Sequence, residues 1–370
     1  MSADGATATK PQSYLNPLVV RGRIEKPQPK GLPTVNLGYN ELPYGPTPLV
    51  VAALSETAQN VNAYGGAGCD AVRAALAQVN GLDADDIICG NGSEELLDVI
   101  GRNFARAGDE VLISAYGYIQ FEMTTRRQGA TLVKAPEADF TTDVDAILAA
   151  VTARTKLVFV ANPNNPTGTV LPFAELARLA QSMPPHIVLV LDLAYCEFDG
   201  FDSAAAVHAL AKGYENVIVT RTFSKAYGLA GARIGWAHAP RRMLPGFYAA
   251  RGMASVNALA QAAALASLAD IEVVRTRVAM LVAERERVAA EMAGLGISAL
   301  PSGTNFLLVT IDGADAEVTE ALVVHFFEDA GLVVGRTREA GLEKFLRFSL
   351  GTPAQNDLLL DSAARFMAAR

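Results

Sequence analysis

The chain has 370 residues, more than one small domain usually holds, so its length favours one large domain with a smaller companion. Hydrophobic residues make up 51% and charged residues 19%, which indicates a globular chain rather than a disordered one. The net charge of -8, without any dense run of Lys or Arg, argues against a nucleic-acid-binding protein.

Cysteine use and the first residues bear on the compartment. Cys69, Cys89 and Cys196 are isolated and have no paired spacing, which favours reduced thiols in a cytoplasm over a disulfide framework. Residues 1–10 contain no apolar signal core and are expected to be disordered. No run of about 18 uncharged apolar residues occurs, so no membrane span is expected.

After a polar, proline-rich beginning up to about Pro33, the patterns of strands and helices alternate. Short β-branched runs at Lys156–Val160, Ile187–Leu191 and Val217–Val219 predict buried parallel strands. The amphipathic stretch Phe173–Met183 lies between the first two and predicts a crossover helix. This alternation is typical of an α/β domain.

Beyond about Arg241 longer helices and isolated strands predict a smaller α+β domain. Helices are expected at Ala258–Leu268, Ile271–Ala293, Val318–Asp329 and Gln355–Ala369, and strands at Asn305–Val309 and Phe345–Leu350. The large domain is expected to span residues 46–245, and the small domain residues 11–45 and 246–370.

Four short polar segments follow one another in the middle of the chain. They are Asn164–Gly168, Asp192–Tyr195, Thr222–Ala226 and Gly231–Gly235. Together they supply an amide, a carboxylate, a phenol, an amine, two hydroxyls and a guanidinium. A protein needs this set to hold and tune pyridoxal 5′-phosphate (PLP), which carries its own difficult chemistry.

The expected catalytic residues are Lys225, Asp192 and Tyr195. The amine of Lys225 lies just beyond a predicted strand and can form a Schiff base with the cofactor aldehyde. Asp192 ends a predicted strand, at the edge where open α/β sheets place ligands, and can pair with the protonated pyridine nitrogen. Tyr195 and Asn165 can donate to the phenolic oxygen of the ring. Each residue also has a plain structural alternative when taken alone: a surface lysine for Lys225, a helix N-cap for Asp192, core packing for Tyr195 and an Asn-Pro turn for Asn165.

Gly92, Ser93 and Glu94 follow the strand-like Ile87-Ile88 and open a predicted helix. The free N–H groups of a helix start can bind a phosphate. The other expected members of this phosphate cup are Thr222, Ser224 and Arg233. In the alternative interpretation Ser93 is an ordinary N-cap. The carboxylate of Glu94 would have to point away from the phosphate.

Tyr118 and Phe121 are the candidates for an aromatic ring stacked on the cofactor, with core packing as the alternative for each. No metal site is expected, because the four histidines are scattered without ligand spacing. The glycines at 228, 231 and 235 form no dinucleotide fingerprint.

These segments resemble fold-type I PLP enzymes, and within them the histidinol-phosphate aminotransferases, from Asn40–Pro46 to Leu346–Thr352. The resemblance implies a large domain with a mostly parallel, seven-stranded sheet flanked by helices, plus a smaller α+β domain. It also implies a homodimer with the active site at the interface, in which Tyr64 reaches the phosphate of the neighbour's cofactor. The expected substrate-binding residues are Arg347, Asn165 and Tyr39, with Arg347 binding the substrate anion.

The sequence departs from the family pattern at the substrate. Leu18 and Met253–Ser255 replace residues usual in the family, and Gly335 replaces a substrate-binding arginine, for which the adjacent Arg336 is a possible substitute. Fewer groups remain to pair a buried phosphate, so another amino donor is an alternative to histidinol phosphate. One bidentate pair from Arg347 suits an α-carboxylate, whereas a side-chain phosphate would need Arg336 as well.

The predicted function is a PLP-dependent aminotransferase. It would move an amino group from histidinol phosphate or an aromatic amino acid to a 2-oxo acid such as 2-oxoglutarate, with Lys225 as general base. A PLP-dependent decarboxylase or lyase is the alternative enzyme, because the same electron sink serves other bonds at the α-carbon. A non-catalytic PLP-binding protein is the alternative from another class.

Overall fold

The structure is a computed structural model that describes residues 31–337 and 339–370. The expectations for residues 1–10 and for Leu18 lie outside this part of the chain. A seven-stranded sheet has the order β2-β10-β9-β8-β7-β3-β4. In chain order its strands are β2 (Ile87–Gly90), β3 (Glu110–Ser114), β4 (Thr131–Ala135), β7 (Thr155–Ala161), β8 (Val188–Asp192), β9 (Val217–Thr222) and β10 (Gly235–His238). All neighbours pair in parallel except β10, which is antiparallel to β2 and β9, so the expected mostly parallel sheet is confirmed.

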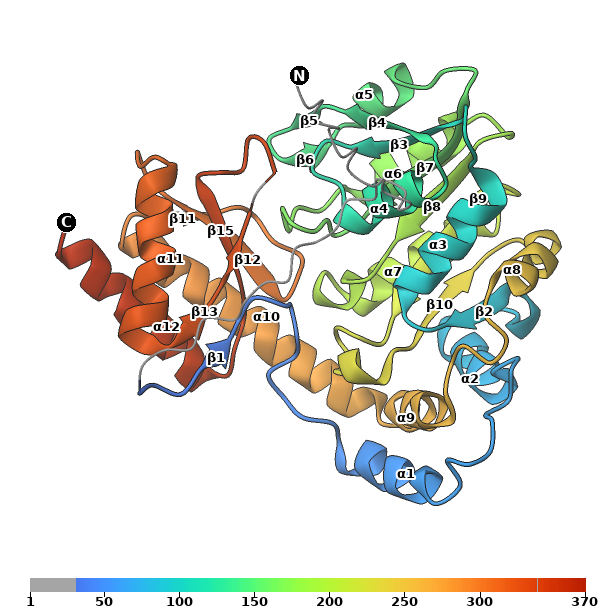
Figure 1. Ribbon diagram of the computed structural model, residues 1–370, viewed down its shortest axis with the longest axis horizontal. Coiled ribbons are helices and arrows are strands. Elements are labelled where there is room, and N and C mark those ends of the chain that lie inside the picture. The colour runs from blue at the N-terminus through green and yellow to red at the C-terminus, as the bar shows by residue number, and fades with distance from the viewer. Residues whose placement is uncertain (1–30, 338) are drawn as a thin grey trace, which may run out of the picture.

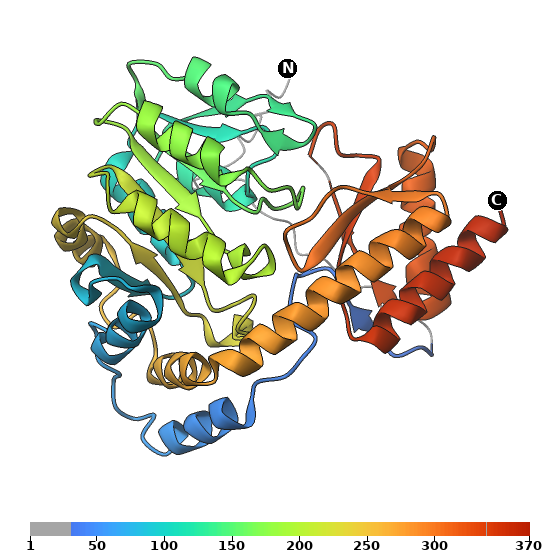
Figure 2. The same cartoon turned by 180° about the vertical axis from the view of Figure 1, so that it is seen from behind.

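Helices cover both faces of this sheet, because side chains alternate along each buried strand. On β7, Val158 and Val160 pack with one set of helices, whereas Leu157 and Phe159 pack with the other. The first set is α5 (Val144–Ala149), α6 (Phe173–Ser182) and α7 (Phe201–Ala211), of which α6 and α7 lie in front in Figure 2. The second set is α3 (Ser93–Phe104), α4 (Ile119–Arg127) and α8 (Leu244–Ala250).

A smaller antiparallel sheet lies beside the large one (Figure 1) and has the order β11-β12-β15-β14. Its strands are β11 (Ile297–Ala299), β12 (Phe306–Ile311), β14 (Gly335–Arg336) and β15 (Phe345–Ser349). It packs with α10 (Ile271–Gly294), α11 (Ala316–Ala330) and α12 (Pro353–Ala368) in a separate core. The long α10 runs from the large sheet to the small one, and α6 and α10 match their predicted ranges closely.

The remaining elements join these layers. α1 (Pro48–Ala58), α2 (Asp70–Asn80) and α9 (Ala258–Ala269) form a further apolar cluster at the β2 edge. β1 (Val35–Asn36) pairs in parallel with β13 (Leu332–Val333), which brings the early chain to the small sheet. β5 (Glu137–Ala138) and β6 (Thr141–Thr142) form a short hairpin. Within the described residues, no helix combines the length and apolar character needed to cross a membrane.

Candidate active site

The predicted cofactor residues gather at the carboxyl ends of the central parallel strands. Asp192 is the last residue of β8 and lies in register between Ala161 of β7 and Thr220 of β9. Lys225 follows the end of β9, and Asn165 follows the end of β7. Open α/β sheets bind ligands at this edge.

Asp192 is a buried carboxylate with 3% exposure. The Thr220 hydroxyl donates to its Oδ1 at 2.9 Å. Burial raises the pKa of Asp192 to about 6, and the negative charge of Glu94 adds to this effect. No helix begins at Asp192, so the N-cap interpretation is wrong. A buried acid of this kind gains stability from a cationic partner such as a protonated ring nitrogen.

Lys225 is half-buried beside the early part of the chain. Its Nζ donates to the carbonyl oxygens of Asn40 at 3.2 Å and Tyr39 at 3.4 Å, and lies 5.6 Å from the centre of the Tyr195 ring. Both acceptors are neutral. They are held in place because the Asn40 N–H donates to the hydroxyl of Ser349 in β15 at 2.8 Å.

Tyr195 serves both core and site. Its ring packs edge-on against Phe306 with centroids 5.4 Å apart, and its residue is 4% exposed. Its hydroxyl accepts a hydrogen bond from Asn40 Nδ2 at 2.9 Å. Asn165 Oδ1 accepts a hydrogen bond from Arg347. The amide nitrogen of Asn165 therefore points away from Arg347.

The start of α3 approaches Arg233 closely. Gly92 is the N-cap and has φ +81°, and a Cβ there would lie 2.4 Å from Arg233 Nη2. Ser93 is the first residue of the helix, so its interpretation as an N-cap is wrong. A Cβ on Gly235 in β10 would lie 2.4 Å from the Ser93 nitrogen. Two glycines thus allow the helix start and the guanidinium to meet.

The other predicted members of the cup lie against this guanidinium. Arg233 Nη1 donates to the Ala230 carbonyl at 3.1 Å and to the Ser224 hydroxyl at 3.4 Å. The Thr222 hydroxyl accepts from the Ser224 N–H at 3.1 Å. Arg233 itself has φ +61°, an uncommon backbone conformation that is often found at functional sites. A helix start, two hydroxyls and a guanidinium suit a phosphate ester.

Glu94 lies differently from expectation. The Tyr118 hydroxyl donates to Glu94 Oε1 at 2.7 Å, and Glu94 Oε2 lies 3.9 Å from Arg233 Nη2. The expectation that its carboxylate points away from the cup is therefore wrong. Burial, with the charge of Glu94, raises the pKa of Tyr118 well above its ordinary value.

Phe121 is not a cofactor-binding residue. Its side chain is completely buried and stacks on Phe159 with centroids 4.8 Å apart and planes at 6°. The prediction was wrong because α4 begins at Ile119 and turns Phe121 into the sheet, while Tyr118 stays at the helix start. Tyr118 remains as the half-buried aromatic ring beside Glu94.

Arg347, the predicted substrate-binding arginine, lies beside Asn165. Its Nη2 donates to the Gly38 carbonyl at 3.1 Å, and its guanidinium lies 5.2 Å from the centre of the Phe306 ring. Gly335 is opposite Arg347 in the β14–β15 ladder, whereas Arg336 is opposite Leu346.

Arg336 does not assist Arg347. Neighbouring residues of a strand face opposite sides, so Arg336 points away from the site. It forms an ion pair of 2.6 Å with Glu320 on α11. The expectation that Arg336 substitutes for an arginine at Gly335 is wrong.

The two other predicted tyrosines are exposed. Tyr39 is 44% exposed, and its backbone carbonyl faces Lys225. Tyr64 is 94% exposed on the segment before α2, so it does not pack against its own chain.

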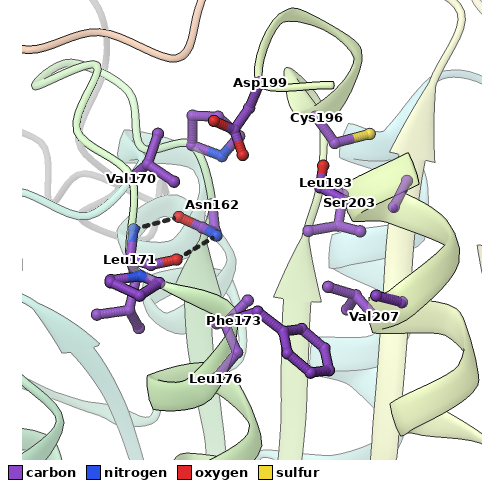
Figure 3. Close-up of a pocket in the computed structure, with 14 residues that line it drawn as sticks. Asn162, Val170, Leu171, Phe173, Leu176, Leu193, Cys196, Asp199, Ser203 and Val207 are labelled. Atoms are coloured by element: carbon purple, nitrogen blue, oxygen red, sulfur yellow. Dashed lines mark hydrogen bonds between the residues drawn. The ribbon is translucent and has the colours of Figure 1, made fainter. Parts of the chain in front are cut away.

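A separate cavity of about 150 Å³ lies between α6 and α7 and is bordered by the loop that joins β7 to α6 (Figure 3). None of the predicted site residues lines it. On its wall Asn162 Nδ2 donates to the Leu171 carbonyl at 3.0 Å, and the Leu171 N–H donates to Asn162 Oδ1 at 2.7 Å. These two bonds close the loop that carries Asn165.

Three polar groups of the site were not predicted individually. Thr220 begins the polar half of β9, Thr220-Arg221-Thr222, a signal that could have identified it. Asn40 and Gly38 act through a segment far away in sequence. Among the described residues no group of three or more His, Cys, Asp or Glu side chains is arranged to hold a metal ion.

Sheet and site together define an enzyme of the PLP-dependent transaminase class. The family model for aminotransferase class I and II matches residues 33–362. The chain therefore belongs to the class I and II aminotransferases and depends on PLP.

Similar proteins identify the family within this class. The chain is 43% identical over 338 residues to the histidinol-phosphate aminotransferase of Erythrobacter litoralis, covering 90% of this chain and 91% of the relative. It is 40% identical to that of Ruegeria pomeroyi, covering 91% and 92%. The crystal structure of histidinol-phosphate aminotransferase from Sinorhizobium meliloti in complex with PLP has a TM-score of 0.86 at 34% identity, covering 91% of each chain. Within its class the chain belongs to the histidinol-phosphate aminotransferase family.

Proposed function

We propose that this aminotransferase accepts a ring-bearing amino donor with a single anionic group, histidinol phosphate first, and passes the amino group to 2-oxoglutarate. The observation that carries the proposal is Arg347, a half-buried guanidinium held by Asn165 and Gly38 at the edge of the site. A fixed guanidinium of this kind pairs with phosphate or carboxylate. The names of the relatives put histidinol phosphate first. Against this, the second guanidinium expected for a phosphate, Arg336, pairs with Glu320 instead.

The residues present fit PLP. Gly92 leaves room for Arg233 at the helix start, and the buried acid Asp192 lacks a cationic partner among the described residues. When bound, PLP supplies an electron sink for the bond broken at the substrate α-carbon. Arg233 with Ser224 and Thr222 would hold its phosphate, and Tyr118 would cover its ring.

Four side chains would carry out the proton chemistry. Asp192 stays ionised once a cation lies beside it, because the pairing lowers its pKa again. Tyr195 and the free amide nitrogen of Asn165 would donate to the phenolic oxygen. Lys225 Nζ would remove the proton from the substrate α-carbon, and its contacts with the carbonyls of Tyr39 and Asn40 hold the amine beside the Tyr195 ring.

We also propose a cytoplasmic homodimer in which Tyr64 reaches the phosphate of the partner's cofactor. Three large apolar side chains stand out from the single chain: Tyr64 at 94%, Met253 at 92% and Val61 at 65% exposure. A partner chain that covered this part of the surface would remove these side chains from water. The three buried cysteines are free thiols, as a reducing compartment requires. Sedimentation of the purified protein tests the dimer.

The donor is tested by single-turnover absorbance measurements on the holoenzyme with histidinol phosphate. We expect histidinol phosphate to change the absorbance of the bound cofactor rapidly, and 2-oxoglutarate to restore the starting absorbance. Arg347→Lys should lower kcat/KM at least tenfold, because lysine keeps the charge but loses the planar fork. Arg336→Ala is the matched control and should change kcat/KM little, because Arg336 faces Glu320. Failure to convert histidinol phosphate, or a collapse in Arg336→Ala, would contradict the proposal.

An aromatic amino acid is the second candidate donor. Arg347 is the single guanidinium on its face of the β14–β15 ladder, because Gly335 lies opposite and Arg336 points away. One guanidinium satisfies an α-carboxylate more completely than a dianionic phosphate. Phenylalanine in the same assay separates the two donors, and its faster conversion would replace histidinol phosphate.

A further inference from the structure

Three aromatic rings meet where the large and small sheets come together. The rings of Phe140 and Phe345 lie 5.1 Å apart at 69°, and those of Tyr116 and Phe140 lie 5.9 Å apart at 32°. We call these three residues the aromatic trio. Figures 1 and 2 both place the β5–β6 hairpin beside the loop that leads into β15. All three residues are half-buried, so part of their surface remains open.

Two members of the trio, Phe345 and Tyr116, adjoin residues of the site, and Phe140 packs against both. Phe345 and Arg347 lie two positions apart on β15, so they share one face about 7 Å apart. The carbonyl of Tyr116 accepts a hydrogen bond from Asn164 Nδ2 at 3.0 Å, next to Asn165. A ligand whose anion pairs with Arg347 therefore has the trio within reach of its side chain.

Phe140 is held in an unfavourable backbone conformation. Asp139 has φ +47° and Phe140 has φ +60°, a left-handed pair that hairpins normally fill with Asn and Gly. The hairpin keeps this shape through β5–β6 pairing and a hydrogen bond of 2.8 Å from the Thr169 hydroxyl to the Phe140 carbonyl. A bulky residue in this region points to a functional constraint. The ring is the part of Phe140 that Asn or Gly could not supply.

We propose that the aromatic trio is the wall of the substrate pocket that recognises the flat ring of the amino donor, while Arg347 binds the donor's anion. Aromatic rings favour edge and offset contacts with one another, so such a wall selects a planar side chain over an aliphatic or acidic one. The inference rests on the proposed ring-bearing donor, but it does not depend on which ring-bearing donor is native. A contact that only joined the two sheets would make no such selection.

The test measures the equilibrium binding of two acids to the purified holoenzyme. The acids are 3-phenylpropionate and propionate, which have no amino group and cannot react. The ratio of the two dissociation constants measures how much the phenyl ring contributes to binding. Phe140→Asn removes the ring yet suits a positive φ, so the hairpin should fold at least as well. We expect the preference for 3-phenylpropionate to fall about fivefold in this variant, a loss typical of one aromatic contact.

Two matched variants accompany it. Phe140→Tyr keeps the ring and should keep the preference. Asp139→Asn relieves the same turn without removing an aromatic ring, and should also keep it.

An unchanged preference in Phe140→Asn would overturn the inference. Equal weakening of both acids would also overturn it, because the trio would then only join the sheets. If histidinol phosphate fails as a donor while the preference still falls in Phe140→Asn, the proposed donor is wrong and the ring wall stands.

Discussion

Replacing Asp192 with asparagine should make the cofactor-free protein more stable while it disables the enzyme. Burial raises the pKa of Asp192 from 3.8 to about 6. Each pKa unit corresponds to about 1.4 kcal/mol, so keeping this carboxylate charged in the folded chain costs about 3 kcal/mol. Asparagine has nearly the same shape and can still accept the hydrogen bond from Thr220.

The pH dependence follows from the direction of the shift. A carboxylate with a raised pKa in the folded chain binds its proton more readily there than in the unfolded chain, so folding is penalised as pH rises from about 4 to about 6. The penalty is complete above this range and absent below it. The gain in Asp192→Asn should therefore be about 3 kcal/mol at pH 8 and about half of that at pH 5.

Urea unfolding of the cofactor-free parent and variant at both pH values measures this gain. Single-turnover conversion of the donor, measured on the loaded variant, should slow by about a hundredfold or more, because an electrostatic partner of the reaction has been lost. A variant that is no more stable than the parent at pH 8 would refute the charged, buried carboxylate. A variant that reacts within about threefold of the parent would refute its role in the chemistry.

Three further predictions test separate parts of the structure. Borohydride should attach the pyridoxyl group to Lys225 in the parent, and Lys225→Ala should abolish turnover while some cofactor still binds; a label on another lysine would contradict the assignment. Gly92→Ala should weaken cofactor binding at least tenfold, measured by absorbance titration, because the new methyl group displaces the guanidinium of the cup. Glu197→Gln should lower the free energy of unfolding by about 3 to 5 kcal/mol, because it leaves buried Arg221 without its ion pair, whereas the exposed Glu215→Gln should cost less than about 1 kcal/mol.

The strands and the residues at their ends were accessible from the sequence. Buried β-branched runs define β7, β8 and β9, and a parallel sheet brings the residues after them to one edge. For this reason the sequence alone places Asp192 and Lys225 at the same edge of the sheet. Their roles in the chemistry remain predictions, as do the domain boundaries.

Errors arose where a single position decides which way a side chain faces. Tyr118 and Phe121 are separated by less than one helical turn, and Gly335 and Arg336 are neighbours in one strand. Composition and spacing do not determine the register of β14 on β15, which is set by packing against the rest of the small sheet. The left-handed turn at Phe140 carries none of the Asn or Gly residues that normally reveal it.

The parallel pair β1–β13 has a consequence for biosynthesis. Val35 pairs with Leu332, so a strand made early by the ribosome waits for one made near the end. The carbonyls beside Lys225 belong to the segment that this pairing positions, and Asn40 is fixed by Ser349. Pairing between distant parts of a chain forms slowly and late. A nascent chain that has completed its large sheet would still lack these neighbours of Lys225, so the surroundings of the predicted cofactor lysine form only when the late strands of the small sheet fold.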